Sequence, residues 1–339
     1  MAVRITTGLL LVLAVLIGMI HRPAPLAAQK AADSDEKDEE YTWKKETRKR
    51  TVKSIILGGE KVEFVKVPAG NFMMGSDKEK DKDAQEDEQP RHKVTFTKPL
   101  WVAKYPVTKG QFAAFVKAKP YESEAESDGK GGYGYDGKEF KKDKEFTWKN
   151  TGWDQTDRHP VVNVTFNDAE AYCAWASKQS KRTVRLLNEA EYEYANRGGE
   201  STIYITGDDA ESLKGFANVG DQSLKAKKIE LRDKYPYFEF DDGESFTSPA
   251  GKYKPNGFGL YDMTGNVYSW CGDFYDVKLY TPRKDGVTDP KANLDGVQRY
   301  RILRGGSWSG YPVFCRASYR TYLGPGVRFI GIGFRVVLD

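Results

Sequence analysis

Residues 255–267 read PNGFGLYDMTGNV, and this stretch decides the fold class. It lies in a long region, residues 199–328, in which hydrophobic side chains follow neither the helical nor the strand period, while Gly, Asn, Asp and aromatic residues recur. Such a chain is ordered only when its backbone polar groups find partners, and bound cations are one common source of partners. The region therefore predicts an α+β domain that is irregular and loop-rich, with few helices and short antiparallel sheets.

Regular segments flank and interrupt this region. Three capping boxes, in which a short polar side chain and a longer one three residues later cover each other's backbone N–H groups, predict helix starts at Thr108, Asn167 and Asn188. The third helix is predicted to end at Gly198, where a left-handed cap is easy. Short hydrophobic runs predict strands at residues 61–67, 93–96, 161–164 and 334–338.

Composition sets limits on function. The 339 residues contain 53 Lys+Arg against 49 Asp+Glu, a net charge of +4, which excludes a strongly basic nucleic-acid-binding protein. With 39% hydrophobic residues and a mean hydropathy of −0.66, only short segments have the character of a membrane span. We therefore expect no nucleic-acid partner and no integral membrane domain apart from an N-terminal signal, and the oligomeric state stays open.

The N-terminus has the pattern of a secretory signal. Arg4 precedes an apolar run at residues 5–20, and small residues follow it, which predicts cleavage near Ala28 and a secreted, periplasmic or cell-envelope location. An uncleaved membrane anchor stays an alternative on the length of the run. No Cys stands directly after the apolar run, which excludes lipidation at a cysteine there.

The segment after the signal is highly charged. Residues 29–55 hold an acidic block and then a basic block with few apolar residues, and this pattern predicts a charged disordered tether. The folded domain is then expected at residues 56–339, with the signal peptide at residues 1–28. Within the domain, the glycine-rich residues 121–144 predict a long surface loop.

Cysteine and histidine are scarce. Cys173, Cys271 and Cys315 form no C-x-x-C pair and allow at most one disulfide, and whether Cys173 pairs with Cys271 stays open. Cys315 has the most reactive setting of the three, because neighbouring cations lower the pKa of a thiol, although an inert thiol is an equal alternative. Only three histidines are present, which excludes a multi-His zinc or iron site within one chain.

Several short motifs follow one another in a fixed order. They are FMMGS (72–76), YPVT (105–108), HPVV (159–162), RLLNEAEYEY (185–194), PNGFGLYDM (255–263), GNV (265–267), RGGSW (304–308) and GFR (333–335). In this order, from about residue 62 to the C-terminus, they resemble the formylglycine-generating enzyme family, also called sulfatase-modifying factors. The resemblance implies the C-type-lectin-like fold of that family, which agrees with the scarce periodicity.

The chemistry of the family depends on a pair of thiols. The resemblance implies Cu(I) held between two cysteines shortly after R-G-G-S, where dioxygen is activated to oxidise a cysteine within a C-x-P-x-R stretch of a sulfatase. Counting without gaps from Ser307 places the first thiol position at Gly310 and the second at Cys315. Aligning residues 316–320 instead makes Cys315 equivalent to neither thiol. A single soft ligand is expected to hold Cu(I) poorly.

Two functions therefore stay open. The missing thiol favours a non-catalytic binding or scaffold module that keeps the fold of the family. The alternative is an active copper-dependent oxidoreductase that uses dioxygen to convert a cysteine of an exported sulfatase to formylglycine, with Cys315 as its catalytic residue. In either case, we expect aromatic and guanidinium groups to line a groove for an extended peptide, namely those of Trp308, Tyr311, Tyr319, Arg316 and Arg320.

The resemblance also implies a structural calcium site in the irregular region. By motif position, the site would use the side chains of Asn218 and Asp242 and the backbone carbonyls of Val219 and Glu244. These ligands are hard oxygens, which Ca²⁺ prefers. The alternative is that Asn218 and Asp242 only cap turns.

A second calcium site is implied by the same motifs. It would use the side chain of Asp262 and the carbonyls of Gly265 and Val267. Ser269 stands where the family usually has Glu, which removes a carboxylate. We therefore expect this second site to be weaker or empty.

Overall fold

The computed structural model describes residues 36–228, 235–294 and 299–339. The signal-peptide prediction and the first residues of the predicted tether lie outside the described residues. Within the described part of the chain, no helix has the length and apolar character needed to cross a membrane.

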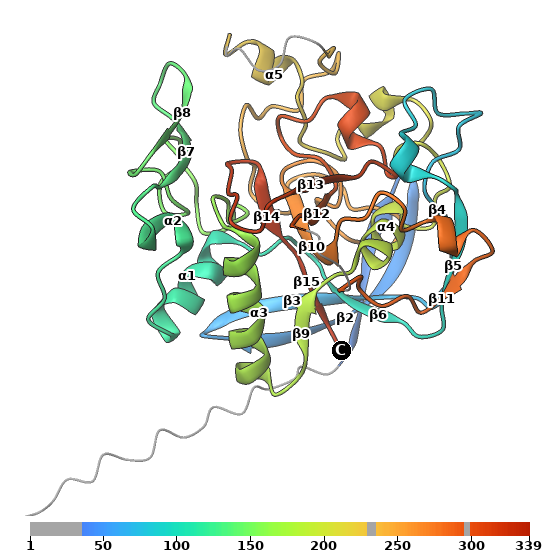
Figure 1. The fold of residues 1–339 in the computed structure, drawn as a ribbon, viewed down its shortest axis with the longest axis horizontal. Helices are drawn as coiled ribbons and strands as arrows, with labels where there is room; N and C mark the ends of the chain where they lie inside the picture. Colours follow the sequence, from blue (N-terminus) through green and yellow to red (C-terminus); the bar gives the residue numbers. More distant parts are fainter. Residues whose placement is uncertain (1–35, 229–234, 295–298) are drawn as a thin grey trace, which may run out of the picture. The chain divides into compact units, whose positions relative to one another are not determined.

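The largest sheet combines the start and the end of the domain. The C-terminal strand β15 lies between β6 and β9, so the last residues of the chain complete the sheet that the first strands begin (Figure 1). Neighbouring strands in this sheet are antiparallel. Its order is β1 (Lys37–Trp43), β2 (Glu46–Leu57), β3 (Glu60–Val67), β6 (Leu100–Ala103), β15 (Val336–Leu338) and β9 (Val184–Leu186).

Three smaller sheets complete the strand structure of the described residues. In the four-stranded sheet, β10 pairs in parallel with β14 and antiparallel with β12. Its order is β13 (Thr321–Leu323), β12 (Arg301–Arg304), β10 (Tyr268–Phe274) and β14 (Ile332–Phe334). The others are β11 (Val287–Thr288), β5 (His92–Phe96) and β4 (Gly70–Met74), and the hairpin of β7 (Gly132–Tyr135) and β8 (Phe140–Asp143).

Two of the three predicted helix starts are confirmed. Helix α1 (Lys109–Ala118) begins after Thr108, whose hydroxyl accepts the N–H of Gln111, and α4 (Glu189–Arg197) begins after Asn188 in the same way. Helix α4 ends at Gly198, which has φ 60°, as predicted. The remaining helices are α3 (Phe166–Ser180) and the single turns α2 (Glu124–Ser127) and α5 (Gln222–Lys225).

The predicted start of α3 is two residues late. The cap is Thr165, whose hydroxyl accepts the N–H of Asp168 at 3.1 Å, while the Asp168 carboxylate accepts the N–H of Thr165 at 2.8 Å. Asn167 instead donates to the Glu124 carboxylate at 2.7 Å. Two overlapping boxes are compatible with the sequence, and contacts with the neighbouring segment select one of them.

Helices α1 and α3 cover one face of the large sheet, and an aromatic core lies between them. Phe64 of β3 packs in this core with Phe112 and Phe115 of α1 and Tyr172 of α3. Helix α4 belongs to a second core with Val65 and Val337 from the same sheet. In Figure 1, α1, α2 and the β7–β8 hairpin gather on one side of the molecule, and β4, β5 and β11 lie on the other.

The prediction of a disordered tether is wrong for residues 36–55, because they form most of the β1–β2 hairpin. In the hairpin, the acidic block faces the basic block, so that Glu39 lies opposite Arg50 and Glu40 lies opposite Lys49. Opposite charges on paired strands stabilise a sheet. Tyr41 and Trp43 are buried, which anchors the hairpin to the domain.

Two further predictions need correction. Residues 121–144 are not one loop, because they include α2 and the β7–β8 hairpin. Residues 161–164 form no named strand, and Asn163 has φ 56°, which no strand residue adopts. The predicted strand at residues 334–338 is divided into β14 and β15 on either side of Arg335.

Candidate functional site

A cavity of about 680 Å³ opens beside the R-G-G-S segment, and we call it the RGGS cavity. Strand β12 leads into this segment, where Gly305 and Gly306 have φ 97° and 74° and turn the chain under the cavity. The lining residues are Tyr133, Tyr268, Leu303, Ser307, Ser309, Gly310, Tyr311, Phe314, Tyr319, Thr321, Leu323, Val327, Arg328, Phe329, Gly331 and Ile332.

The thiol of Cys315 lies behind the cavity wall. Cys315 is 1% exposed, and its Sγ–H donates to the Gly310 carbonyl at 3.7 Å. Burial raises the pKa of this thiol well above its usual value. The predicted reactive setting is therefore wrong, because a buried neutral thiol is a poor nucleophile and a poor metal ligand.

The structure brings positions 310 and 315 together. A Cβ atom built on Gly310 would lie 3.1 Å from Cys315 Sγ, within reach of a shared ligand. Position 310 thus carries no thiol although it faces one. Cys173 and Cys271 are buried in two other cores, and all three cysteines are free.

These residues do not fit Cu(I). A two-thiol site needs a second soft ligand beside Cys315, and Gly310 offers only backbone atoms. Within the described residues, no group of three or more His, Cys, Asp and Glu side chains could hold a metal ion either. A calcium site would therefore have to use amide and carbonyl oxygens as well.

Of the five residues predicted to line a peptide groove, Tyr311 and Tyr319 line the RGGS cavity and the other three do not. Trp308 is buried, and its Nε1–H donates to the Ile330 carbonyl at 3.0 Å. Arg316 is buried against Glu88, with an Nη2–Oε1 distance of 2.7 Å. Arg320 is buried against Glu189 with an Nε–Oε1 distance of 2.6 Å, so the prediction is wrong for both arginines.

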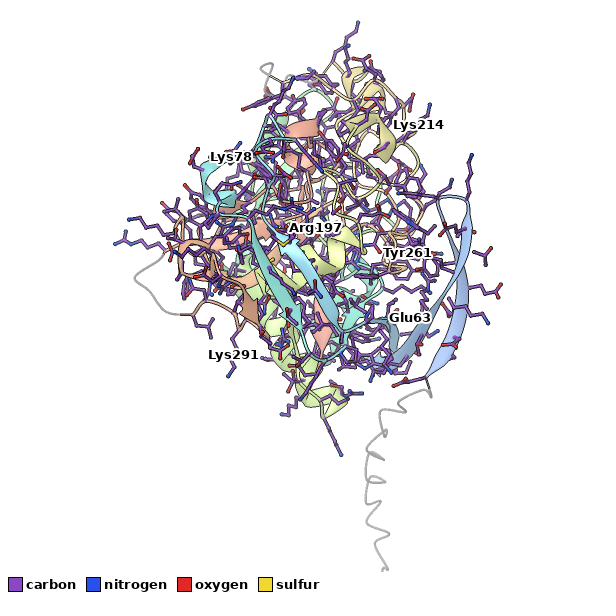
Figure 2. The ribbon with its side chains drawn as sticks, turned by 90° about the vertical axis from the view of Figure 1, so that its right-hand side faces the viewer. Glu63, Lys78, Arg197, Lys214, Tyr261 and Lys291 are labelled. Atoms are coloured by element: carbon purple, nitrogen blue, oxygen red, sulfur yellow. The ribbon has the colours of Figure 1, made fainter. Side chains whose placement is uncertain are left out.

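These arginines belong to an interior ionic network. Arg304 forms ion pairs with Glu193 and Glu189, and Arg197 pairs with Glu193 at 2.8 Å. Arg197 is the last residue of helix α4, it is buried, and its label lies near the centre of the view in Figure 2. Because each of these guanidinium groups is neutralised inside the protein, the network connects loops and leaves little charge for a ligand.

The RGGS cavity is mainly apolar and aromatic. Among the described residues that line it, none is Asp or Glu, and Arg328 is the only charged one. Asp128 holds Arg328 Nη2 with both carboxylate oxygens, at 2.7 and 2.8 Å. The hydroxyls of Ser307 and Ser309 lie 3.3 Å apart and provide polar contacts. The cavity therefore suits an uncharged, apolar group.

The first implied calcium site has one buried side-chain oxygen without a partner. Asn218 Oδ1 is buried and has no hydrogen-bond partner, while Asn218 Nδ2 donates to the Phe246 carbonyl at 2.8 Å. The Asp242 carboxylate accepts the N–H groups of Val219 and Glu244, at 2.9 and 2.8 Å. Burial raises the pKa of Asp242 to about 7. A cation would remove this penalty, so these residues fit Ca²⁺.

Sequence reasoning missed Asp221 beside this site. Asp221 is buried, and its carboxylate accepts the N–H of Asp242. It also accepts the N–H of Ser223 at 2.9 Å as the cap of α5. An Asp directly before a short helical turn, the pattern of an N-cap, was the available signal in the sequence.

The second implied site is less complete. Asp262 has φ 52°, and its Oδ1 is buried without a partner, while Oδ2 accepts the N–H of Gly251 at 2.7 Å. Burial raises the pKa of Asp262 to about 6. Ser269 is buried and supplies a hydroxyl in place of a carboxylate. One orphaned carboxylate oxygen fits a cation, but the loss of the second charge weakens the site.

The short sheets, the long ordered loops and the cavity beside R-G-G-S define a domain of the formylglycine-generating-enzyme type, with a C-type-lectin-like fold. Residues 58–339 match the model of the sulfatase-modifying factor enzyme 1-like domain, and the chain belongs to this family. The β1–β2 hairpin begins before the matched region.

Named relatives support this assignment. The chain is 33% identical to the formylglycine-generating enzyme of Mycobacterium tuberculosis, over 82% of this chain and 98% of the relative. It is 30% identical to inactive C-alpha-formylglycine-generating enzyme 2 of Bos taurus, over 76% of this chain and 82% of the relative. Among solved structures, PvdO from Pseudomonas aeruginosa is 30% identical, with a TM-score of 0.61 over 82% of this chain and 94% of PvdO.

Proposed function

We propose that this protein is an exported, non-oxidative binding module that holds an extended segment of a partner polypeptide in the RGGS cavity. One observation carries the proposal: Gly310 stands next to the buried thiol of Cys315, where a copper site would need a second thiol. Without two thiolates the chain has no soft pair for Cu(I), whereas the cavity beside them is large enough for a side chain.

The lining of the cavity supports an uncharged ligand group. An arginine, such as the one in a C-x-P-x-R sequence, would need a carboxylate partner when it leaves water. The described lining residues include no carboxylate, and Arg328 already has Asp128. An apolar side chain would instead contact the rings of Tyr311, Phe314 and Phe329.

Calcium and export are part of the same proposal. The orphaned oxygens of Asn218 and Asp262 support structural Ca²⁺ in the irregular region. The N-terminal sequence supports secretion through a cleaved signal into the periplasm, the cell envelope or the medium. A binding module in these compartments would meet exported proteins, among which a sulfatase is one candidate partner.

A second function is favoured by the relatives. Several of them are named formylglycine-generating enzymes and match most of this chain. On this alternative, the protein would convert a cysteine of a sulfatase to formylglycine with Cys315 as its remaining thiol. The buried state of Cys315 opposes this alternative.

The two functions are separated by one assay. The mature protein is incubated with Cu(I), dioxygen, a reductant and a peptide that contains C-x-P-x-R, and mass spectrometry follows the peptide cysteine. We expect no conversion to the aldehyde, both in the wild type and in Cys315→Ala. Conversion by the wild type that Cys315→Ala abolishes would establish the enzyme and overturn the proposal.

A further inference from the structure

A second cavity, of about 420 Å³, lies away from the R-G-G-S segment. Helix α3 contributes Phe166 and Glu170, strand β9 contributes Leu186, and strand β12 contributes Arg301. Neither cavity shares a lining residue with the other. We call this second cavity the α3–β12 cavity.

Arg301 is an unusual cation in this protein. Its guanidinium is held between two rings, with Cζ 3.6 Å from the centroid of Phe274 and 4.2 Å from that of Phe166. Nη1 donates to the Gly272 carbonyl at 2.8 Å, and Nε is buried without an acceptor. The rings fix the plane of the guanidinium, so that its remaining donors are preorganised.

Several other interior arginines have carboxylate partners, whereas Arg335 donates to the backbone carbonyls of Ala103 and Asp262. Arg304, Arg316 and Arg320 each form an ion pair with Glu. Among the described residues, none places a carboxylate within 4.0 Å of Arg301, and partial desolvation lowers the pKa of Arg301. A partly buried cation without a counter-ion is costly, and a bound anion would offset that cost.

An uncompensated carboxylate lines the same cavity. Glu170 is exposed at the rim and forms no ion pair with a described residue, although it and Arg301 interact electrostatically at longer range. Desolvation raises the pKa of Glu170. The other two carboxylates that line the cavity already have partners. Glu191 pairs with Arg185 at an oxygen–nitrogen distance of 2.8 Å, and Asp289 accepts the N–H of Thr97.

We propose that the α3–β12 cavity binds a small zwitterion with an apolar side chain, in other words an apolar α-amino acid. Its carboxylate pairs with the guanidinium of Arg301, and its ammonium group pairs with Glu170. The side chain lies against the apolar walls formed by Phe96, Leu100 and Leu186. Lys291 also lines this cavity but is exposed, and Figure 2 shows it at the edge of the molecule, so it stays in water.

Titration calorimetry with the mature protein tests this proposal, with L-leucine as the probe. Leucinamide lacks the carboxylate and 4-methylpentanoate lacks the amine, so each removes one of the two pairings. We expect L-leucine to bind saturably, and each analogue to bind at least about tenfold more weakly, as the loss of a charge-assisted hydrogen bond implies.

Variants connect the binding to the two side chains. Arg301→Lys keeps the charge but loses the planar donors, and Glu170→Gln is a mild change at an exposed position. Each is expected to weaken L-leucine binding about tenfold, while the exposed control Lys138→Gln leaves it unchanged. Absence of binding to the folded wild type, equal binding of either analogue, or unchanged binding by Glu170→Gln would overturn the proposal.

Discussion

The region behind the RGGS cavity and the region around Asn218 and Asp262 have kept different parts of the family pattern. Behind the cavity, the R-G-G-S turn is present and Cys315 supplies a thiol at the second thiol position, but Gly310 occupies the first. Around Asn218, both implied side-chain ligands are present: Asn218 is buried with Oδ1 unpartnered, and Asp242 is half-buried and accepts two backbone N–H groups. The comparison teaches that one residue can remove a two-ligand copper site, whereas a calcium site with many oxygen ligands tolerates substitution.

The surroundings of the two regions differ as well. Behind the cavity, the polar groups are satisfied by ion pairs such as Arg316 with Glu88. Around Asn218 and Asp262, burial leaves one oxygen of each of these two side chains without a partner. Burial also raises the pKa of the Asp242 carboxyl. We therefore expect the first region to be stable without a ligand, and we expect a bound cation to stabilise the second.

The largest expected effect comes from breaking the ionic network behind the cavity. Arg316→Ala would leave Glu88 and Asp81 buried without their cation, because Arg316 Nη1 lies 2.7 Å from Asp81 Oδ2. We expect the free energy of unfolding to fall by about 3–5 kcal/mol, measured by urea denaturation. Lys78→Ala removes the exposed ion pair with Glu86 and should cost less than about 1 kcal/mol.

This pair of variants also tests the assignment of Arg316. A loss below about 1 kcal/mol in Arg316→Ala would contradict an interior role, because breaking a buried pair costs more than breaking an exposed one. Arg316 would then be assigned again to the peptide groove predicted from the sequence.

Calcium removal should produce the next largest loss in the free energy of unfolding. This loss should depend on the implied ligands in the irregular region. With Ca²⁺ at a hundred times its Kd, binding adds about 2.7 kcal/mol to the free energy of unfolding, and a chelator removes it. Asn218→Ala should lose most of this gain, because the buried Oδ1 is expected to be a ligand. The exposed control Asn71→Ala should keep it. Thermal unfolding with and without a chelator measures both.

Equal melting temperatures with calcium and with a chelator would show that Asn218 and Asp242 only cap turns. The second site offers a finer comparison. Ser269→Glu introduces a carboxylate at the position where the family usually has Glu, and a larger calcium stabilisation than in the wild type is expected from the added charge.

Local signals and long-range contacts explain what could be predicted from the sequence. The caps at Thr108 and Asn188 were predictable because each capping box lies within a few residues of chain. The β1–β2 hairpin was missed because its acidic and basic blocks look disordered until they are paired across two strands. The partners of Arg316 are more than two hundred residues away in sequence, so no local pattern reveals them.

The candidate sites follow the same division. The motifs located the R-G-G-S turn and the oxygens of Asn218 and Asp262, since these depend on residue order alone. The burial of Cys315 and the lack of a partner for Asn218 Oδ1 depend on packing between distant segments. The unpaired guanidinium of Arg301 likewise appears only when Phe166 and Phe274 are brought to either side of it.

The pH dependence of stability should differ with and without calcium. Burial raises the pKa of Asp242 to about 7 and that of Asp262 to about 6, above the usual value of 3.8. Near pH 4 and below, both carboxyls are protonated in the folded protein. As pH rises toward 7, the unfolded chain releases these protons more readily, so the metal-free protein loses stability.

Calcium should reverse this trend, because it binds the ionised carboxylates and competes with protons. We therefore expect the stabilisation by calcium to grow from pH 5 to pH 8, measured as the difference in melting temperature at each pH. In Asp242→Asn, the loss of metal-free stability over this range should be smaller. A calcium effect that is constant across the range would contradict the assignment of these carboxyls as ligands.

The smallest expected effect comes from restoring the second thiol that the RGGS region lacks. Gly310→Cys places a second thiol beside Cys315, because a Cβ at position 310 lies 3.1 Å from Cys315 Sγ. The same Cβ lies 2.9 Å from the Ser307 carbonyl, so the backbone must shift slightly. We expect Cu(I) to bind at least about tenfold more tightly than to the wild type, a gain of about 1.4 kcal/mol, measured by competition with a chromophoric chelator.

Two controls separate the thiol from the added bulk. Gly310→Ala introduces the Cβ alone, and the double variant Gly310→Cys with Cys315→Ala keeps only the new thiol. Both should bind Cu(I) no better than the wild type, because neither offers two soft ligands. If Gly310→Cys and the double variant bind equally, Cys315 is not the retained member of the pair. The alignment that makes Cys315 equivalent to neither thiol would then hold, and the loss of copper chemistry would involve both positions.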